Sequence, residues 1–269
     1  MEKASELCGR DAMGLTFCLD EKSWTYQDMG CFDLAMATSE RSIAIGPGNS
    51  KAHHQLAIIY HNLGLNEATE LSYQKALALD EKYAIAQNNL GCLFRELERW
   101  QEAIACFERA LEINPKYSLS YRNRALLHLL RRERRAAEKD IRSALQVNPY
   151  DASVKLYLGV HQALSGDLIT AQATWRDGLI LYPEHDLRSR LYRTIYTVAL
   201  GQPEQGLAEL QTILQQERPP AGLLREVLQI ARLLQRCPEP LPGLAEAVRL
   251  LDWGRGNAPV FELKPPPSA

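Results

Sequence analysis

The chain has 269 residues, 46% of them hydrophobic, so it can bury a sizeable core, and disorder is not the default expectation. Its 31 Lys and Arg nearly balance its 33 Asp and Glu, which leaves a formal charge of -2. No global field therefore favours DNA, RNA or an anionic membrane, and such a partner would need a local basic patch.

The N-terminal segment, residues 1–15, is polar and carries acidic residues. Neither this segment nor any later stretch is apolar enough for a signal peptide or a membrane span. The six cysteines are widely spaced and include no Cys-x-x-Cys pair, a pattern that fits neither a zinc site nor a disulfide framework. Reduced cysteines favour an intracellular compartment, so we expect a cytoplasmic protein without a membrane span.

From residue 50 onward the sequence repeats every 34 residues. Prolines at this interval define the units 50–83, 84–117, 118–151 and 152–185. Small residues recur at positions 8, 20 and 27 of the units, and bulky ones at positions 7 and 24. Within each unit, apolar residues follow a helical spacing in two blocks separated by a short polar stretch. Each unit is therefore predicted to be a helix hairpin, with small residues where the helices cross.

The flanking residues keep only part of this pattern. Residues 16–49 read as a degenerate first repeat, whose first helix, expected over Thr16 to Met29, has Lys22 and Ser23 where Leu and Gly are expected. Residues 186–218 read as a degenerate last repeat, which fits only if one residue has been inserted. Such departures suit terminal units, which face solvent on one side.

The C-terminal residues lack the small-residue pattern of the repeats. Residues 219–253 contain helical stretches over Ala221 to Gln235 and Pro242 to Asp252, which we interpret as a helical cap or as the remnant of another hairpin. Residues 254–269 are rich in Gly and Pro, and we expect them to form a flexible tail.

The four aligned units resemble the tetratricopeptide repeat, whose period is 34 residues and whose signature places small residues at positions 8, 20 and 27 and proline at position 32. The match is fullest in 84–117 and covers 50–185 in register. The resemblance implies an all-α fold, a right-handed α-solenoid of stacked antiparallel helix hairpins. It also implies a protein that binds other proteins and is not an enzyme, and no catalytic or phosphate-binding motif contradicts this.

In this family the first helix of each unit lines a concave groove, with positions 5 and 6 facing it. Those positions carry the predicted partner-binding residues His54, Gln55, Asn88, Asn89, Arg122, Asn123 and Tyr157. Asn89 and Asn123 lie one repeat apart, and a primary amide offers both a donor and an acceptor to a peptide backbone. The clamp that chaperone-binding members use is broken, with Ile58 and Cys92 at position 9, which argues against chaperone C-terminal tails as ligands.

A second candidate surface is basic. The segment 121–142 has a net charge of +5, and a basic edge falls at its inter-helix turn, made of Arg131, Arg132, Arg134 and Arg135. The lack of interleaved aromatic residues argues against nucleic acid. Arg124 stands at position 7, where three other units carry Leu, so it must either reach solvent or pair with a carboxylate.

Two functional hypotheses follow. The leading one is a non-enzymatic scaffold or adaptor that binds a partner peptide or helix in the concave groove. The alternative is a regulatory or accessory subunit of an enzyme or nucleic-acid machine, which contacts an acidic partner through the basic edge at 131–135. Neither hypothesis involves a cofactor, a metal ion or a small-molecule substrate.

Overall fold

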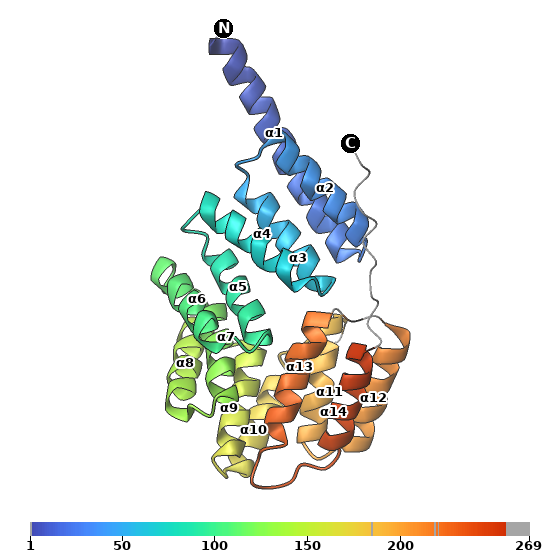
Figure 1. Cartoon of the computed structure of the whole chain (residues 1–269). Helices are drawn as coiled ribbons and strands as arrows, with labels where there is room; N and C mark the ends of the chain where they lie inside the picture. The colour runs from blue at the N-terminus through green and yellow to red at the C-terminus, as the bar shows by residue number, and fades with distance from the viewer. Residues whose placement is uncertain (1, 184, 218, 220, 257–269) are drawn as a thin grey trace. The chain divides into compact units, whose positions relative to one another are not determined.

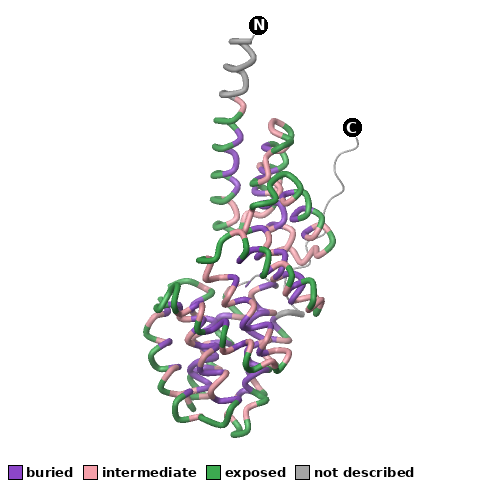
Figure 2. Tube along the Cα trace, turned by 90° about the vertical axis from the view of Figure 1, so that its left-hand side faces the viewer, coloured by how far each residue is buried: buried purple, intermediate pink, exposed green. Residues whose placement is uncertain are grey.

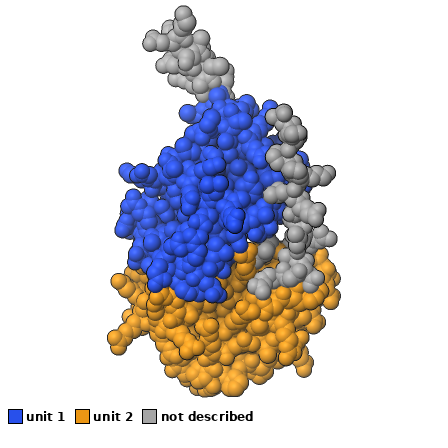
Figure 3. Space-filling view, in the orientation of Figure 1, with its two compact units in different colours: residues 1–115 blue, residues 116–269 orange. Residues whose placement is uncertain are grey.

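The computed structural model describes residues 2–183, 185–217, 219 and 221–256 (Figure 1). In these residues every regular element is an α-helix, and consecutive helices pair into antiparallel hairpins. The all-α fold of stacked hairpins predicted from the sequence is confirmed. The chain divides into two compact units, residues 1–115 (unit 1) and residues 116–269 (unit 2), coloured separately in Figure 3.

Unit 1 begins with a helix that is longer than its partner. Its helices are α1 (Glu2–Asp28), α2 (Phe32–Ile45), α3 (Ser50–Asn62), α4 (Asn66–Leu79), α5 (Ala84–Glu96) and α6 (Trp100–Ile113). The second helix of one hairpin packs on the first helix of the next, α2 on α3 and α4 on α5. The expected start of the first helix at Thr16 is wrong, because α1 begins at Glu2 and has 27 residues against 14 in α2.

Unit 2 continues the hairpins and then departs from them. Its helices are α7 (Ser118–Leu130), α8 (Arg134–Val147), α9 (Ala152–Leu164), α10 (Leu168–Leu179), α11 (Leu187–Ala199), α12 (Pro203–Gln216), α13 (Ala221–Leu234) and α14 (Leu244–Gly256). Helix α14 packs against α11 and α12, the place where a further repeat would stack. Helix α13 instead lies against α7, α9 and α11, with α14 packed on it.

The turn inside each hairpin places one residue in the left-handed region of backbone conformation. These residues recur at the repeat period: Gly30, Gly64, Glu98, Arg132 and Gly166, followed by Gly201 one residue later than the period predicts. The late position of Gly201 matches the single inserted residue expected in 186–218. Glycine adopts a positive φ without steric cost, whereas Glu98 at 59° and Arg132 at 63° are held there by the hairpin.

The hairpin cores consist of the small and bulky residues that the repeat aligns. Figure 2 shows the buried residues along the inner sides of the helices. A Cβ atom added to Gly91 would lie 2.7 Å from Cε1 of Phe107, and one added to Gly159 would lie 2.2 Å from Nε1 of Trp175. Both rings are fully buried. The small position therefore leaves room for the large one, as the spacing predicts.

Arg124 breaks the apolar pattern at position 7 and is paired with a carboxylate. Its Nε and Nη2 atoms each donate to the carboxylate of Asp140, both at 2.7 Å. Asp140 is buried and occupies position 23 of its unit, where the unit 50–83 carries Ser72. Asp140 therefore compensates for Arg124, because it supplies the carboxylate that this guanidinium needs. A buried charge is tolerated only when it is paired and hydrogen-bonded.

Candidate functional site

The first helices of the hairpins carry the residues predicted to bind a partner. In unit 1 these helices are α1, α3 and α5, and we call the surface they form the first-helix face of unit 1. In unit 2 they are α7, α9 and α11, which form the first-helix face of unit 2. The two faces differ in what covers them.

In unit 1 the structure brings His54, Asn88 and Asn89 together. Nδ2 of Asn89 lies 3.1 Å from Nε2 of His54, and Asn88 donates to Oδ1 of Asn89 at 3.1 Å. The hydroxyl of Tyr83 lies 3.2 Å from Nδ1 of His54. Because the Asn89 amide donates to Nε2, we assign the ring proton to Nδ1, which donates to Tyr83. The imidazole in this arrangement is neutral.

Burial also keeps this imidazole neutral. His54 is 2% exposed, and desolvation by burial lowers its pKa to about 4. The neighbouring Gln55 is also buried, and its Nε2 donates to the carbonyl oxygen of Asp20 at 2.9 Å. These predicted residues therefore use their polar atoms to tie α1, α3 and α5 to one another inside unit 1.

A hollow of about 180 Å³ opens beside this network. It is lined by Phe17, Asp20, Glu21, Trp24, Lys51, His54, Gln55 and Tyr83. Phe17 and Trp24 of α1 are 58% and 41% exposed. They lie seven residues apart, two helical turns, and so occupy one side of α1. A second hollow of about 470 Å³, between α1 and the α2–α3 connection, also includes Phe17. The first-helix face of unit 1 thus presents aromatic surface to solvent.

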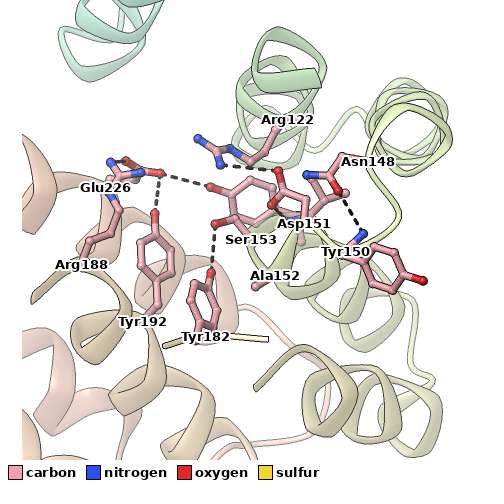
Figure 4. A network of polar contacts seen from close by, with 12 residues as sticks. Arg122, Asn148, Tyr150, Asp151, Ala152, Ser153, Tyr182, Arg188, Tyr192 and Glu226 are labelled. Carbon is pink, nitrogen blue, oxygen red and sulfur yellow. Dashed lines mark hydrogen bonds and ion pairs between the residues drawn. The ribbon is translucent and has the colours of Figure 1, made fainter. Parts of the chain in front are cut away.

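The first-helix face of unit 2 is covered by α13, and Figure 4 shows the polar cluster at this contact. Glu226 of α13 accepts hydrogen bonds from the hydroxyl of Tyr192 at 2.5 Å and from that of Tyr157 at 3.3 Å. Nη2 of Arg188 donates to the other carboxylate oxygen at 3.2 Å. Glu226 is only 7% exposed, and Tyr157 is fully buried. Tyr157, which we predicted to face a partner, contacts α13 in the structure.

The remaining predicted residues of unit 2 lie on α7. Nη1 of Arg122 is 3.6 Å from Oδ2 of Asp151, and its buried Nε has no hydrogen-bond partner. Figure 4 shows Arg122 in the same cluster as Glu226. Asn123 is buried in unit 2, whereas Asn89 belongs to unit 1. Binding of one peptide by both amides remains a prediction.

The basic edge lies at the turn between α7 and α8. Arg131 pairs with Glu133 at 2.9 Å, whereas Arg132, Arg134 and Arg135 are exposed. The first turn of α8 contains no acidic residue, so the positive end of the helix dipole adds to their charge. Arg236, which follows α13, joins Arg132 and Arg134 around a hollow of about 120 Å³. Sequence reasoning did not place Arg236 here.

Sequence reasoning also missed Phe17, Trp24 and Glu226. The two aromatic residues share one side of a predicted helix, but they stand in a repeat that departs from the pattern, so the aligned positions did not select them. Glu226 is the sole acidic residue in the apolar sequence of α13, which is a weak signal of a buried ionic contact.

Comparison with known proteins agrees with this geometry. The tetratricopeptide repeat family model matches residues 50–83 and 84–117. No curated protein matches the chain by sequence. None of the helices in the described residues combines the length and the apolar composition that a membrane crossing requires.

Several solved structures share the fold. The chain is similar to PilF of Pseudomonas aeruginosa, at 19% identity and a TM-score of 0.60, over 76% of this chain and 93% of that one. It is similar to PilW, a widely conserved type IV pilus biogenesis factor, at 20% identity and 0.60, over 75% and 93%. A thermophilic repeat protein of Thermus thermophilus gives 22% identity and 0.59, over 69% and 98%. At these identities the likeness shows the fold alone. The two matched segments identify tetratricopeptide repeats over residues 50–117 of this chain, and the left-handed turn residues recur at the same 34-residue period from Gly30 to Gly166.

Proposed function

We propose that this protein is a non-enzymatic scaffold or adaptor that holds a peptide or helix of a partner protein on the first-helix face of unit 1. The tetratricopeptide repeats over residues 50–117 support a role in protein interaction in general. The observation that carries the more specific proposal is the exposure of Phe17, which lines both hollows, and of Trp24, which lines the smaller one. Aromatic residues in pockets are the usual anchors of protein interfaces.

The surroundings of the two aromatic residues fit such an anchor. Burying a large apolar side chain contributes about 1.5–3 kcal/mol, so two of them supply a useful part of a binding energy. Lys51 and Glu21 line the same hollow and offer charges of both signs to a partner. His54 and Gln55, two of the residues predicted from the repeat, also line it. In unit 2 a helix of the chain itself lies across the equivalent face, which supports a helix as the occupant.

The test is affinity purification followed by mass spectrometry, with the parent chain and a Phe17→Ser/Trp24→Ser variant. Ile169→Ser is the matched control, because Ile169 is an exposed apolar residue, at 86%, on α10 of the other unit. We expect partners of the parent chain to fall at least tenfold with the double variant and to remain with the control. Unchanged recovery with the double variant, at unchanged helical content, would refute the proposal.

The basic edge supports a second candidate function, contact with an acidic partner. The specific observation is the group of exposed guanidinium groups at the α7–α8 turn, to which Arg236 adds another. If Arg132→Glu/Arg135→Glu abolishes binding, and binding to the parent chain weakens steeply with salt, this surface is the one in use. A groove contact built on aromatic residues would respond little to salt.

We propose a cytoplasmic location for this scaffold. Cys18, Cys31, Cys92, Cys106 and Cys237 are free thiols in the structure, which supports a reducing compartment. Fractionation of cells that express the natural protein at its normal level tests the location directly.

A further inference from the structure

We propose that the first-helix face of unit 2 is a binding site for an amphipathic helix that carries one carboxylate on its apolar side, and that α13 occupies this site as a ligand built into the chain. A partner helix of the same chemistry would exchange with α13. This site is separate from the face of unit 1 to which the proposed function is assigned.

The position of α13 is that of a ligand rather than of a further repeat. Before α13, within each unit, the helix that follows a hairpin packs on the second helix of that hairpin, as α3 packs on α2, α5 on α4 and α9 on α8. After α12 this place is taken by α14, while α13 lies across the first helices α7, α9 and α11. A helix bound from another molecule would lie on the same three helices.

The receptor side of this contact recognises a carboxylate. The donors to Glu226 come from two different hairpins, Tyr157 from α9 and Arg188 with Tyr192 from α11. Burial raises the pKa of Tyr192 well above its usual value, so its hydroxyl keeps the proton that it donates. Four neutral or cationic groups therefore surround the carboxylate position when Arg122 is included (Figure 4).

The cluster also has unused hydrogen-bonding capacity. The Nε atom of Arg122 is buried and has no hydrogen-bond partner, and the nearest carboxylate of Asp151 is 3.6 Å from its Nη1. A buried guanidinium nitrogen without an acceptor is costly. The first-helix face of unit 2 therefore offers hydrogen-bond donors to a carboxylate, and Glu226 leaves one of them, Nε of Arg122, unused.

The apolar side of α13 specifies the rest of the partner. The buried residues on the same side of α13 as Glu226 are Val227, Ile230, Leu233 and Leu234. The fitting partner is therefore a helix with Leu, Ile or Val at these spacings and a single Glu among them. A helix with Lys or Arg at the place of Glu226 would meet Arg188 and Arg122 and be rejected.

Because α13 is covalently joined to its binding site, exchange with a free helix has to be measured in variants whose α13 binds more weakly. A helix joined by a short connection has an effective concentration of about millimolar, so a free helix with the same contacts competes poorly with α13. Removing the carboxylate from α13 weakens the tethered ligand, because it removes the charged group to which Tyr157, Tyr192 and Arg188 donate. A free helix that still carries the Glu restores those hydrogen bonds and becomes the better ligand.

The experiment uses the full chain as parent, Glu226→Ala and Glu226→Gln, with a fluorescent synthetic peptide of residues 221–236 as the probe. A second peptide carries Gln in place of Glu226. We expect the Glu226→Ala and Glu226→Gln chains to bind the Glu peptide at least tenfold more tightly than the parent chain does. We also expect both variant chains to prefer the Glu peptide to the Gln peptide by at least tenfold, in fluorescence anisotropy titrations.

Three results would overturn the inference. One is peptide binding to the variants that is as weak as binding to the parent, and another is equal binding of the two peptides. The third is loss of the helical circular dichroism signal in the isosteric Glu226→Gln chain, because a helix that unit 2 needs in order to fold is not an exchangeable ligand. The Phe17→Ser/Trp24→Ser variant should leave peptide binding unchanged, which separates this site from the face of unit 1.

Discussion

The contact between Gly159 of α9 and Trp175 of α10 allows a sharp test of the packing. In Gly159→Ala the new Cβ atom would lie 2.2 Å from Nε1 and 2.4 Å from Cδ1 of the Trp175 ring, whereas ordinary contact begins at 3.4 Å. The buried ring must therefore move by about an ångström in a close-packed interior. Its Nε1 donates to the carbonyl oxygen of Leu156 at 3.3 Å, and this hydrogen bond would break.

The expected cost follows from these losses. Overpacking a core costs about 1–3 kcal/mol, and a lost hydrogen bond costs about 1 kcal/mol more. The better helix propensity of alanine returns about 1 kcal/mol. We therefore expect Gly159→Ala to lower the free energy of unfolding by about 1–3 kcal/mol. Gly14→Ala is the matched control, because Gly14 lies in α1 with no atom within 4 Å of the added Cβ, and it should stabilise the chain slightly.

Urea unfolding followed by circular dichroism measures the effect. The variant Gly159→Ala/Trp175→Ile reproduces the pair that α7 and α8 carry, Ala125 and Ile141, and it relieves the clash. We expect a favourable coupling energy of about 0.5–3 kcal/mol between the two substitutions. If Gly159→Ala proves as stable as Gly14→Ala, the assignment of positions 8 and 24 as packing partners is wrong.

Three further substitutions test other features. Arg124→Leu should destabilise the chain by about 3 kcal/mol, because it leaves the buried carboxylate of Asp140 without its guanidinium, and Arg124→Leu/Asp140→Ser should recover most of that loss in thermal unfolding. Glu98→Gly should raise the urea midpoint, with a gain of about 1 kcal/mol, because φ is 59° there, and a lower midpoint would contradict the strain. Since burial lowers the pKa of His54 to about 4, the unfolded chain binds the proton first as the pH falls below about 6.5, so stability should drop by about 3 kcal/mol between pH 7 and pH 4. His54→Gln should lose that part of the pH dependence in urea titrations at the two pH values.

Part of the candidate site could be predicted from the sequence. The repeat register assigned His54 and Gln55 to the surface of the first helices, and the structure places both around the hollow of unit 1. The register could not indicate that their polar atoms are used inside the chain, because Tyr83 lies in the connection between α4 and α5 and Asp20 lies in α1, outside the aligned helix positions. Nor could it select Phe17 and Trp24, which stand in a repeat with few aligned positions.

The sequence by itself determined the hairpins, their order and their internal packing. The contact between positions 8 and 24 joins residues of the same unit, so it recurs with the period and leaves a visible pattern, as at Gly91 with Phe107. The left-handed turn residues recur for the same reason. Packing contacts and turns that repeat along the chain can be recognised from the sequence period, without coordinates.

Only the tertiary structure decided what covers the first helices. Glu226 reaches Tyr192 across 34 residues and Tyr157 across 69, and these contacts occur once in the chain. Helix α13 carries apolar residues at helical spacing, and this pattern alone does not identify the helices against which α13 packs. The choice depends on the donors that α9 and α11 present together at one point in space, and a contact made by several separate helices leaves no periodic trace in the sequence.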